Sequence, residues 1–261
     1  GQNNVQGACD MAALPNFYPG YQLVDSAEIR AKFSKAWGVE TPETPGLMVT
    51  KMFPAVLEGK IKAMYIMGEN PVLSDADVTH VEEALEKLDF LVVQDIFMTE
   101  TAKFADVVLP ATSYAERDGT YVNTERRVQL TKPVVAPPGS ARRDLEIICD
   151  IAAAIGYPMT YESTSDVNDE MRSLTPSYTG ISHARLEAGE QLHWPCLSDD
   201  HPGTPILRSE KFARGLGLFH PIEFIAADEE TDASFPIILT TGRMLEHYHT
   251  GTMTRSEERR V

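Results

Sequence analysis

The sequence predicts an α/β fold built around a parallel sheet, followed by the start of a second domain. Three short apolar runs, at residues 63–67, 90–93 and 106–109, have the character of buried strands. Between the first two runs, apolar residues recur at helical spacing: Val78, Val81, Leu85 and Leu88. Strands that alternate with helices in this way are typical of parallel βαβ units with right-handed crossovers.

The segment before the sheet is predicted to be irregular and then helical. Residues 1–22 are rich in Gly, Asn and Pro, which favours irregular structure. Asp25 and Ser26 each offer a cap for a following helix, whose apolar stripe consists of Ile29, Phe33 and Trp37.

A second helix is predicted between this one and the first strand. A Pro/Gly linker at 41–46 leads into it, and Gly59 is the expected end. Ser74 is the expected cap of the helix that follows the first strand.

The second half of the chain carries weaker signals. Residues 119–131 alternate as in a short antiparallel excursion or an extended loop. A helical stripe over 145–155 is closed by Gly156, and residues 160–210 suggest two short helices between polar connections. Residues 235–240 are predicted to form a strand.

A domain boundary is predicted at the polar run of residues 228–232, Asp-Glu-Glu-Thr-Asp. Residues 1–227 would then form the α/β domain, and 228–261 a linker and the first strand of the next domain. The chain begins without Met in polar sequence, so we expect a piece of something longer.

Composition excludes some classes of function. The net charge is -16, whereas nucleic-acid binding needs a basic surface, so no nucleic-acid partner is expected. No run is long and apolar enough to span a membrane. The three cysteines are far apart, with no disulfide or zinc framework, which favours a reducing, cytoplasmic setting. An export signal preceding Gly1 would instead allow a periplasmic location.

Two polar turns follow the first two predicted strands. Gly68, Glu69, Asn70 and Pro71 form the first, and Gln94, Asp95 and Ile96 open the second. Ligands of open parallel sheets bind at the carboxyl ends of strands, and a carboxylate can accept hydrogen bonds from guanine or ribose. Taken alone, the first tetrapeptide is read more simply as a loop in which Asn and Pro make the turn.

Asp106, at the head of the third strand, strengthens the ligand interpretation, because acidic groups at neighbouring strand ends rarely serve packing. No G-x-G-x-x-G or G-x-x-x-x-G-K-[ST] motif occurs, so neither an ordinary NAD site nor a P-loop is supported. These residues favour a large polar cofactor and reveal no catalytic nucleophile or base.

A third polar cluster spans residues 241–253, directly after the strand predicted at 235–240. Its donors suit a diphosphate or a polar heterocycle, with Arg243 as a fork donor. His247 and His249 share a face only on a strand, and no third ligand is evident, so no metal site is predicted.

The chain resembles the molybdopterin oxidoreductases, and within them the catalytic (alpha) subunit of molybdenum- or tungsten-dependent formate dehydrogenases. The segments that carry the resemblance occur in the family's order along nearly the whole chain: residues 1–11, 14–15, 18–21, 67–71, 94–110, 116–127, 242–243, 246–248 and 251–254. The likeness is weakest over 160–230.

The resemblance implies a Rossmann-like domain of the formate dehydrogenase and DMSO reductase type that lacks its N-terminal portion and is followed by the start of a C-terminal β-barrel. It also implies a molybdenum or tungsten ion held by two molybdopterin guanine dinucleotides (bis-MGD). The 68–71 and 94–95 turns would contact one guanosine end with Asp106 nearby. Residues 243–253 would pack over the cofactor, and the resemblance makes Gly242, Arg243, Glu246 and His247 candidate ligands there. Gln2 would lie near the active site, because the family's essential arginine precedes the Gly-Gln pair.

The resemblance further implies that the intact subunit oxidises formate to CO₂ and passes two electrons to a [4Fe-4S] cluster, and then to partner subunits or carriers. The essential arginine, the metal-ligating Cys or Sec with its histidine, and the cluster cysteines lie upstream of this segment in the family. No catalytic residue is therefore expected within the chain, which alone would be inactive.

Two alternatives stay open. The chain could be a non-catalytic nucleotide-binding or interaction module, or part of a relative that acts on another substrate such as nitrate. If the rest of the domain is absent, we also expect an exposed apolar face, seen as dye binding or self-association.

Overall fold

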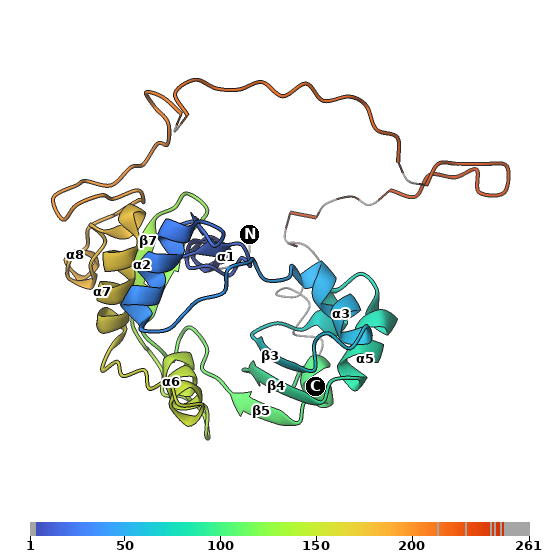
Figure 1. The fold of residues 1–261 in the computed structure, drawn as a ribbon, viewed down its shortest axis with the longest axis horizontal. Helices are drawn as coiled ribbons and strands as arrows, with labels where there is room; N and C mark the ends of the chain where they lie inside the picture. Colours follow the sequence, from blue (N-terminus) through green and yellow to red (C-terminus); the bar gives the residue numbers. More distant parts are fainter. Residues whose placement is uncertain are drawn as a thin grey trace. The chain divides into compact units, whose positions relative to one another are not determined.

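A computed structural model describes residues 4–212, 214–227 and 229–240, together with 242, 244, 245 and 247 (Figure 1). The chain divides into two units, residues 1–205 and 206–261. The predicted domain boundary after residue 227 stays a prediction.

The first unit begins with short elements around one longer helix. Helix α1 (Val5–Asp10) precedes a two-strand hairpin, β1 (Phe17–Tyr18) and β2 (Gln22–Leu23), and then α2 (Ala27–Trp37). The prediction for α2 is confirmed: the Ser26 side chain accepts from the Ile29 N–H at 3.4 Å, and Gly38 ends the helix with φ +69°. The expectation of wholly irregular structure over 1–22 is wrong, because α1 and the hairpin form there.

A three-stranded parallel sheet follows, as predicted. Helix α3 (Val49–Leu57) leads into β3 (Ala63–Met67), α4 (Pro71–Ser74), α5 (Val78–Glu86), β4 (Phe90–Asp95), the 3₁₀ turn η1 (Thr101–Phe104) and β5 (Val107–Pro110). The strand order is β3-β4-β5, and both pairings are parallel. Ser74 ends α4 and does not cap α5, whose cap is Asp77, accepting from the His80 N–H at 3.2 Å.

The sheet buries one face and exposes much of the other. Apolar residues of α3 and α5 pack on the face that carries Ile66, Leu91 and Val93, and both helices lie on this side in Figure 1. Parallel sheets normally have both faces covered. Here, however, Met67 is 48% exposed and Phe90 is 47% exposed on the opposite face.

The rest of the first unit combines a hairpin with helices. Strands β6 (Gly119–Val122) and β7 (Val128–Thr131) pair antiparallel, which confirms the predicted excursion. Helix α6 (Asp144–Ala154) follows, then α7 (Thr164–Leu174), the 3₁₀ turn η2 (Pro176–Tyr178) and α8 (His183–Glu187). Gly156, with φ +88°, follows α6 as predicted.

In the second unit, the described residues form no helix and no named strand. Residues 235–240, predicted as a strand, have no pairing partner there, and Leu239 is 92% exposed. A strand needs a neighbouring strand to satisfy its backbone N–H and C=O groups. An apolar run in the sequence does not show whether such a neighbouring strand exists. Across the described part of the chain, no helix has the length and apolarity needed to cross a membrane.

Candidate functional site

The carboxyl ends of β3 and β4 bring the two predicted turns together. Met67 pairs with Gln94 across the strands, and the Gly68 N–H donates to the Gln94 carbonyl at 2.9 Å. Gly68 has φ +65°, a conformation that L side chains rarely adopt, and no atom lies within 4 Å of where its Cβ would be. The backbone at Gly68 is therefore open to close approach by a ligand.

Two carboxylates border this opening, one from each turn. Desolvation by the surrounding protein, and then the charge of Asp95, raise the pKa of Glu69. Desolvation also raises the pKa of Asp95, against the backbone N–H groups of Phe97 and Ile96, which lower it; the Phe97 N–H lies 3.0 Å from Asp95 Oδ1. Two neighbouring carboxylates offer acceptor oxygens to a group rich in N–H or O–H donors. Ile96, 48% exposed, adds an apolar surface beside them.

Asn70 and Pro71 hold the turns in place. The Asn70 Oδ1 accepts from the Thr101 hydroxyl at 2.8 Å and from the Thr101 N–H at 3.2 Å, while Nδ2 donates to Glu100 Oε2 at 2.7 Å. Pro71 is buried at the first position of α4. Asn70 thus ties the turn after β3 to the segment after β4, and its amide is already occupied by protein groups.

The Gln94 side chain is also fully engaged. It is 0% exposed, its Oε1 accepts from the Tyr65 hydroxyl, and its Nε2 donates to Asp144 Oδ1 at 2.6 Å. Asp144, the first residue of α6, also pairs with Arg117. Gln94 therefore links the sheet to the hairpin-and-helix half of the unit.

Sequence reasoning missed Asp144 and Arg117. The sequence placed an acidic residue, Asp144, at the start of a predicted helix. Acidic residues are common at that position in helices whose first turn makes no contact with a distant residue, so the position alone did not indicate a site. The two residues border a hollow of about 210 Å³ beside the start of α1, lined also by Asn4, Tyr121, Arg143 and Thr164.

Asp106 lies at the opposite ends of the strands, where they begin. Its carboxylate accepts from the Leu91 N–H at 2.7 Å, at the beginning of β4, whereas Asp95 ends that strand. The expectation that the two acids sit together at neighbouring strand ends is wrong. In a parallel sheet, a residue that precedes a strand lies at the amino ends of the strands, away from the carboxyl ends where Asp95 is. At the amino ends, Asp106 accepts a hydrogen bond from a backbone N–H group.

The remaining predicted site residues lie in other parts of the chain. Gln2, Arg243 and Glu246 lie outside the described residues. Gly242 and His247 belong to the second unit, where the His247 N–H donates to the Met244 carbonyl at 3.2 Å. Among the described residues, no three His, Cys, Asp or Glu side chains are grouped to hold a metal ion.

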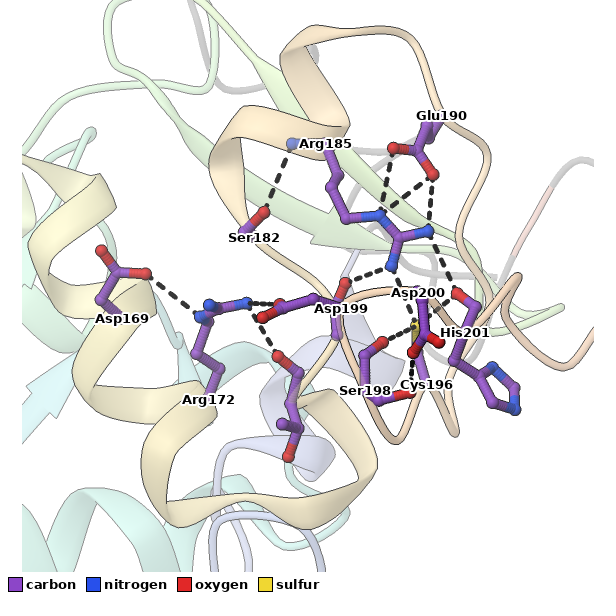
Figure 2. Close-up of polar contacts among 12 residues, drawn as sticks. Asp169, Arg172, Ser182, Arg185, Glu190, Cys196, Ser198, Asp199, Asp200 and His201 are labelled. Carbon is purple, nitrogen blue, oxygen red and sulfur yellow. Dashed lines mark hydrogen bonds and ion pairs between the residues drawn. The ribbon is translucent and has the colours of Figure 1, made fainter.

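Away from the carboxyl ends of the strands, a separate group of polar contacts surrounds Arg185 and Cys196 (Figure 2). The Arg185 guanidinium pairs with Glu190 at 2.6 Å and donates to the carbonyls of Gly180 at 2.7 Å and His201 at 3.0 Å. Burial raises the pKa of the Cys196 thiol, so it is not an activated nucleophile. The cluster fastens the loop after α8.

The comparisons with known proteins give one family model and several curated relatives. The model for "Molybdopterin oxidoreductase" matches residues 1–154. The alpha subunit of the F420-dependent formate dehydrogenase of Methanocaldococcus jannaschii is 52% identical over 260 residues, which cover 98% of this chain and 38% of that protein. Formate dehydrogenase H of Escherichia coli is 41% identical, over 97% of this chain and 36% of its own length.

One relative whose name gives a different substrate is almost as similar to this chain as the Escherichia coli formate dehydrogenase is. The assimilatory nitrate reductase catalytic subunit of Bacillus subtilis is 40% identical over 98% of this chain and 38% of its own length. The chain therefore spans little more than a third of these three relatives. Acetylene hydratase from Pelobacter acetylenicus superimposes on 66% of this chain with a TM-score of 0.48 and 24% identity, a likeness too partial to add to these matches.

Proposed function

Because this chain belongs to the molybdopterin oxidoreductase family, we propose that it is part of a formate dehydrogenase catalytic subunit and holds one guanine dinucleotide end of a pterin cofactor. Identities of 52% and 41% to two formate dehydrogenases support the substrate. The single observation that carries the binding role is the edge where Gly68, Glu69 and Asp95 meet.

The groups at this edge fit a guanine. Guanine presents an N1–H and an N2–H₂ along one side, and Glu69 and Asp95 offer carboxylate acceptors whose pKa values burial raises. The open backbone at Gly68 allows close approach of a flat ring. Both carboxylates would gain hydrogen-bond donors from the ring.

In this proposal, the chain's own residues bind and orient, while the cofactor supplies redox chemistry at molybdenum or tungsten. Formate would lose two electrons and one proton to become CO₂, and the electrons would leave through an iron–sulfur cluster and partner subunits. Glu69 and Asp95 would fix the far end of the cofactor, and Asn70 would keep the two turns at the spacing that the ring requires. We also propose that residues 228–261 form the linker and first strand of a β-barrel.

A second candidate substrate is nitrate. The Bacillus subtilis nitrate reductase is within one percentage point of the Escherichia coli formate dehydrogenase in identity to this chain. Parallel assays of formate oxidation and nitrate reduction by the complete subunit separate the two. A non-catalytic module would show neither activity.

The binding role is tested by calorimetric titration of the purified chain with GDP. We expect saturable binding that is lost in Glu69→Ala and Asp95→Ala and kept in Glu83→Ala, a matched control in which an exposed acid of α5 is removed. Binding that persists in both site variants would locate the nucleotide elsewhere. No saturable binding by the unmodified chain would contradict a cradle preformed in these residues.

A further inference from the structure

Gln94 is fully buried on a face of the sheet that is otherwise largely exposed. It pairs with Met67 in β3 and with Leu109 in β5, so the three side chains point to the same face. Met67 is 48% exposed there, whereas Gln94 is 0% exposed. A buried amide needs hydrogen-bond partners, so the groups that cover Gln94 deserve a role of their own.

Two residues from different elements cover the Gln94 amide. Within the sheet, the Tyr65 hydroxyl donates to Oε1, and from outside it Asp144, the first residue of α6, accepts from Nε2 at 2.6 Å. Burial raises the pKa of Tyr65, so its hydroxyl stays a donor at neutral pH. Because Tyr65 occupies the amide oxygen, the amide presents its NH₂ group to α6. The contact between sheet and helix therefore has one defined donor and one defined acceptor.

The apolar packing of α6 beside the sheet is incomplete. A hollow of about 140 Å³ is bordered by Leu109 and Pro110 of β5 and by Ile147 and Ile151 of α6. Side chains that border a hollow lose dispersion contacts on that side. The Arg142 N–H, just before the helix, donates to the Pro110 carbonyl at 3.0 Å. Polar contacts therefore contribute much of what keeps the start of α6 beside the strands.

The Gln94 backbone also lies between the two turns at the carboxyl ends of β3 and β4. Its carbonyl accepts from the Gly68 N–H at 2.9 Å, and Asp95 follows it directly. We call the place where Gly68, Glu69 and Asp95 meet the nucleotide-binding edge. A shift of Gln94 would move both turns of this edge together with the start of α6.

We propose that Gln94 is a positioning residue, which fastens the start of α6 to the sheet and so holds the nucleotide-binding edge in one arrangement. Fully satisfied polar networks fix the elements that they join in this way. The inference rests on the proposed function for the identity of the ligand. The Gln94 side chain is buried, and its amide oxygen and nitrogen both have protein partners, so it acts without contacting the nucleotide.

The first arm of the test measures hydrogen exchange in the purified chain. Gln94→Glu keeps the side chain's shape but turns the donor that faces Asp144 into an acceptor. The amides of the first turn of α6 and of Gly68 should then exchange at least about tenfold faster, while those of α5 stay unchanged. Adding Asp144→Asn places a donor opposite the new acceptor, and exchange should return to within about threefold of the original rates.

This exchange of donor and acceptor separates a specific contact from a general loss of stability. Unchanged exchange in Gln94→Glu would overturn the proposal, and so would faster exchange by the same factor in α5. Failure of Asp144→Asn to restore the rates would overturn it as well. Gln129→Glu, at an exposed glutamine of β7, is the matched control and should leave all these amides unchanged.

The second arm measures GDP binding by calorimetric titration. We expect Kd to rise at least about tenfold in Gln94→Glu and to return to within about threefold when Asp144→Asn is added. The double variant has one acid and one amide, as the unmodified pair does, so added charge is not the cause of a difference. An unaltered Kd in Gln94→Glu would contradict the positioning role. Restored exchange without restored binding would mean that one of the two side chains contacts the nucleotide, which also overturns the proposal.

The two arms separate this inference from the proposed function. If the unmodified chain binds no GDP, the preformed nucleotide site fails, and the exchange arm alone decides whether Gln94 fastens α6 to both turns. If Gln94→Glu does not fold, Tyr65→Phe carries both measurements, because it removes the donor that orients the amide. Its expected changes have the same direction and are smaller, and equal rates and affinity would overturn the proposal. Tyr114→Phe, at a tyrosine that is 65% exposed, is its control.

Discussion

Replacing Asn70 with alanine should destabilise the protein by about 3 kcal/mol. The substitution removes three hydrogen bonds, two to Thr101 and one to the Glu100 carboxylate. Each contributes about 1 kcal/mol, and the bond to an ionised group somewhat more. Thr101 is 0% exposed, so its freed hydroxyl and N–H groups would have no water to replace the lost acceptor.

The assay is urea unfolding of the purified chain followed by circular dichroism. The midpoint of thermal unfolding should also fall, by about 6–12 °C. Gln191→Ala is the control: this exposed amide makes one long contact, 3.5 Å to Arg127, and its loss should change stability by less than about 0.5 kcal/mol. A loss below about 1 kcal/mol in Asn70→Ala would refute the structural role. If GDP binding vanished at the same time, Asn70 would be a ligand contact instead.

Three further predictions follow from the same structure. Gly180→Ala places a Cβ 2.0 Å from the Ser198 carbonyl oxygen and should lower stability by about 2–3 kcal/mol in urea unfolding, whereas Gly46→Ala, with its nearest atom at 3.4 Å, should be nearly neutral. Because the pKa of Glu69 is raised, the folded state binds the proton of this carboxyl more tightly than the unfolded state does. The ionised carboxylate therefore lowers stability at neutral pH, and this loss disappears as the pH falls toward the ordinary pKa of 4.5. Glu69→Gln should therefore be more stable than the unmodified chain at pH 7, with urea midpoints converging near pH 4.5; a constant difference would contradict the sign. The chain should bind a hydrophobic dye through the exposed sheet face, and Met67→Ser with Phe90→Ser should reduce the fluorescence without lowering the melting temperature.

The parallel sheet was predictable because its signals are local. The run at 63–67 is β3 as predicted, and the run at 90–93 is the first part of β4, two residues short of its end. An apolar run bounded by polar turns identifies a strand, and an intervening amphipathic helix makes the pairing parallel. The adjacency of Glu69 and Asp95 follows from that topology, because both residues lie at the carboxyl ends of neighbouring strands that run the same way.

Long-range partners were not predictable in this way. Gln94 contacts Asp144, 50 positions later, and Asp10 contacts Tyr178, 168 positions later. Such pairs depend on how separate halves pack, which no local pattern encodes. The position of Asp106 was misjudged for a different reason: in the parallel sheet that the sequence predicts, a residue before a strand lies at the amino ends of the strands, whereas Asp95 lies at a carboxyl end.

The one-sided sheet has a consequence for the order of folding. Its covered face draws on residues 53–108, a contiguous stretch in which α3 and α5 contact strands nearby in the chain. Contacts between residues close in sequence form quickly, because little loop entropy is lost. The β3–β5 layer with its two helices can therefore assemble early, whereas Met67 and Phe90 stay exposed on the opposite face. Until something covers it, that exposed apolar face favours self-association during folding.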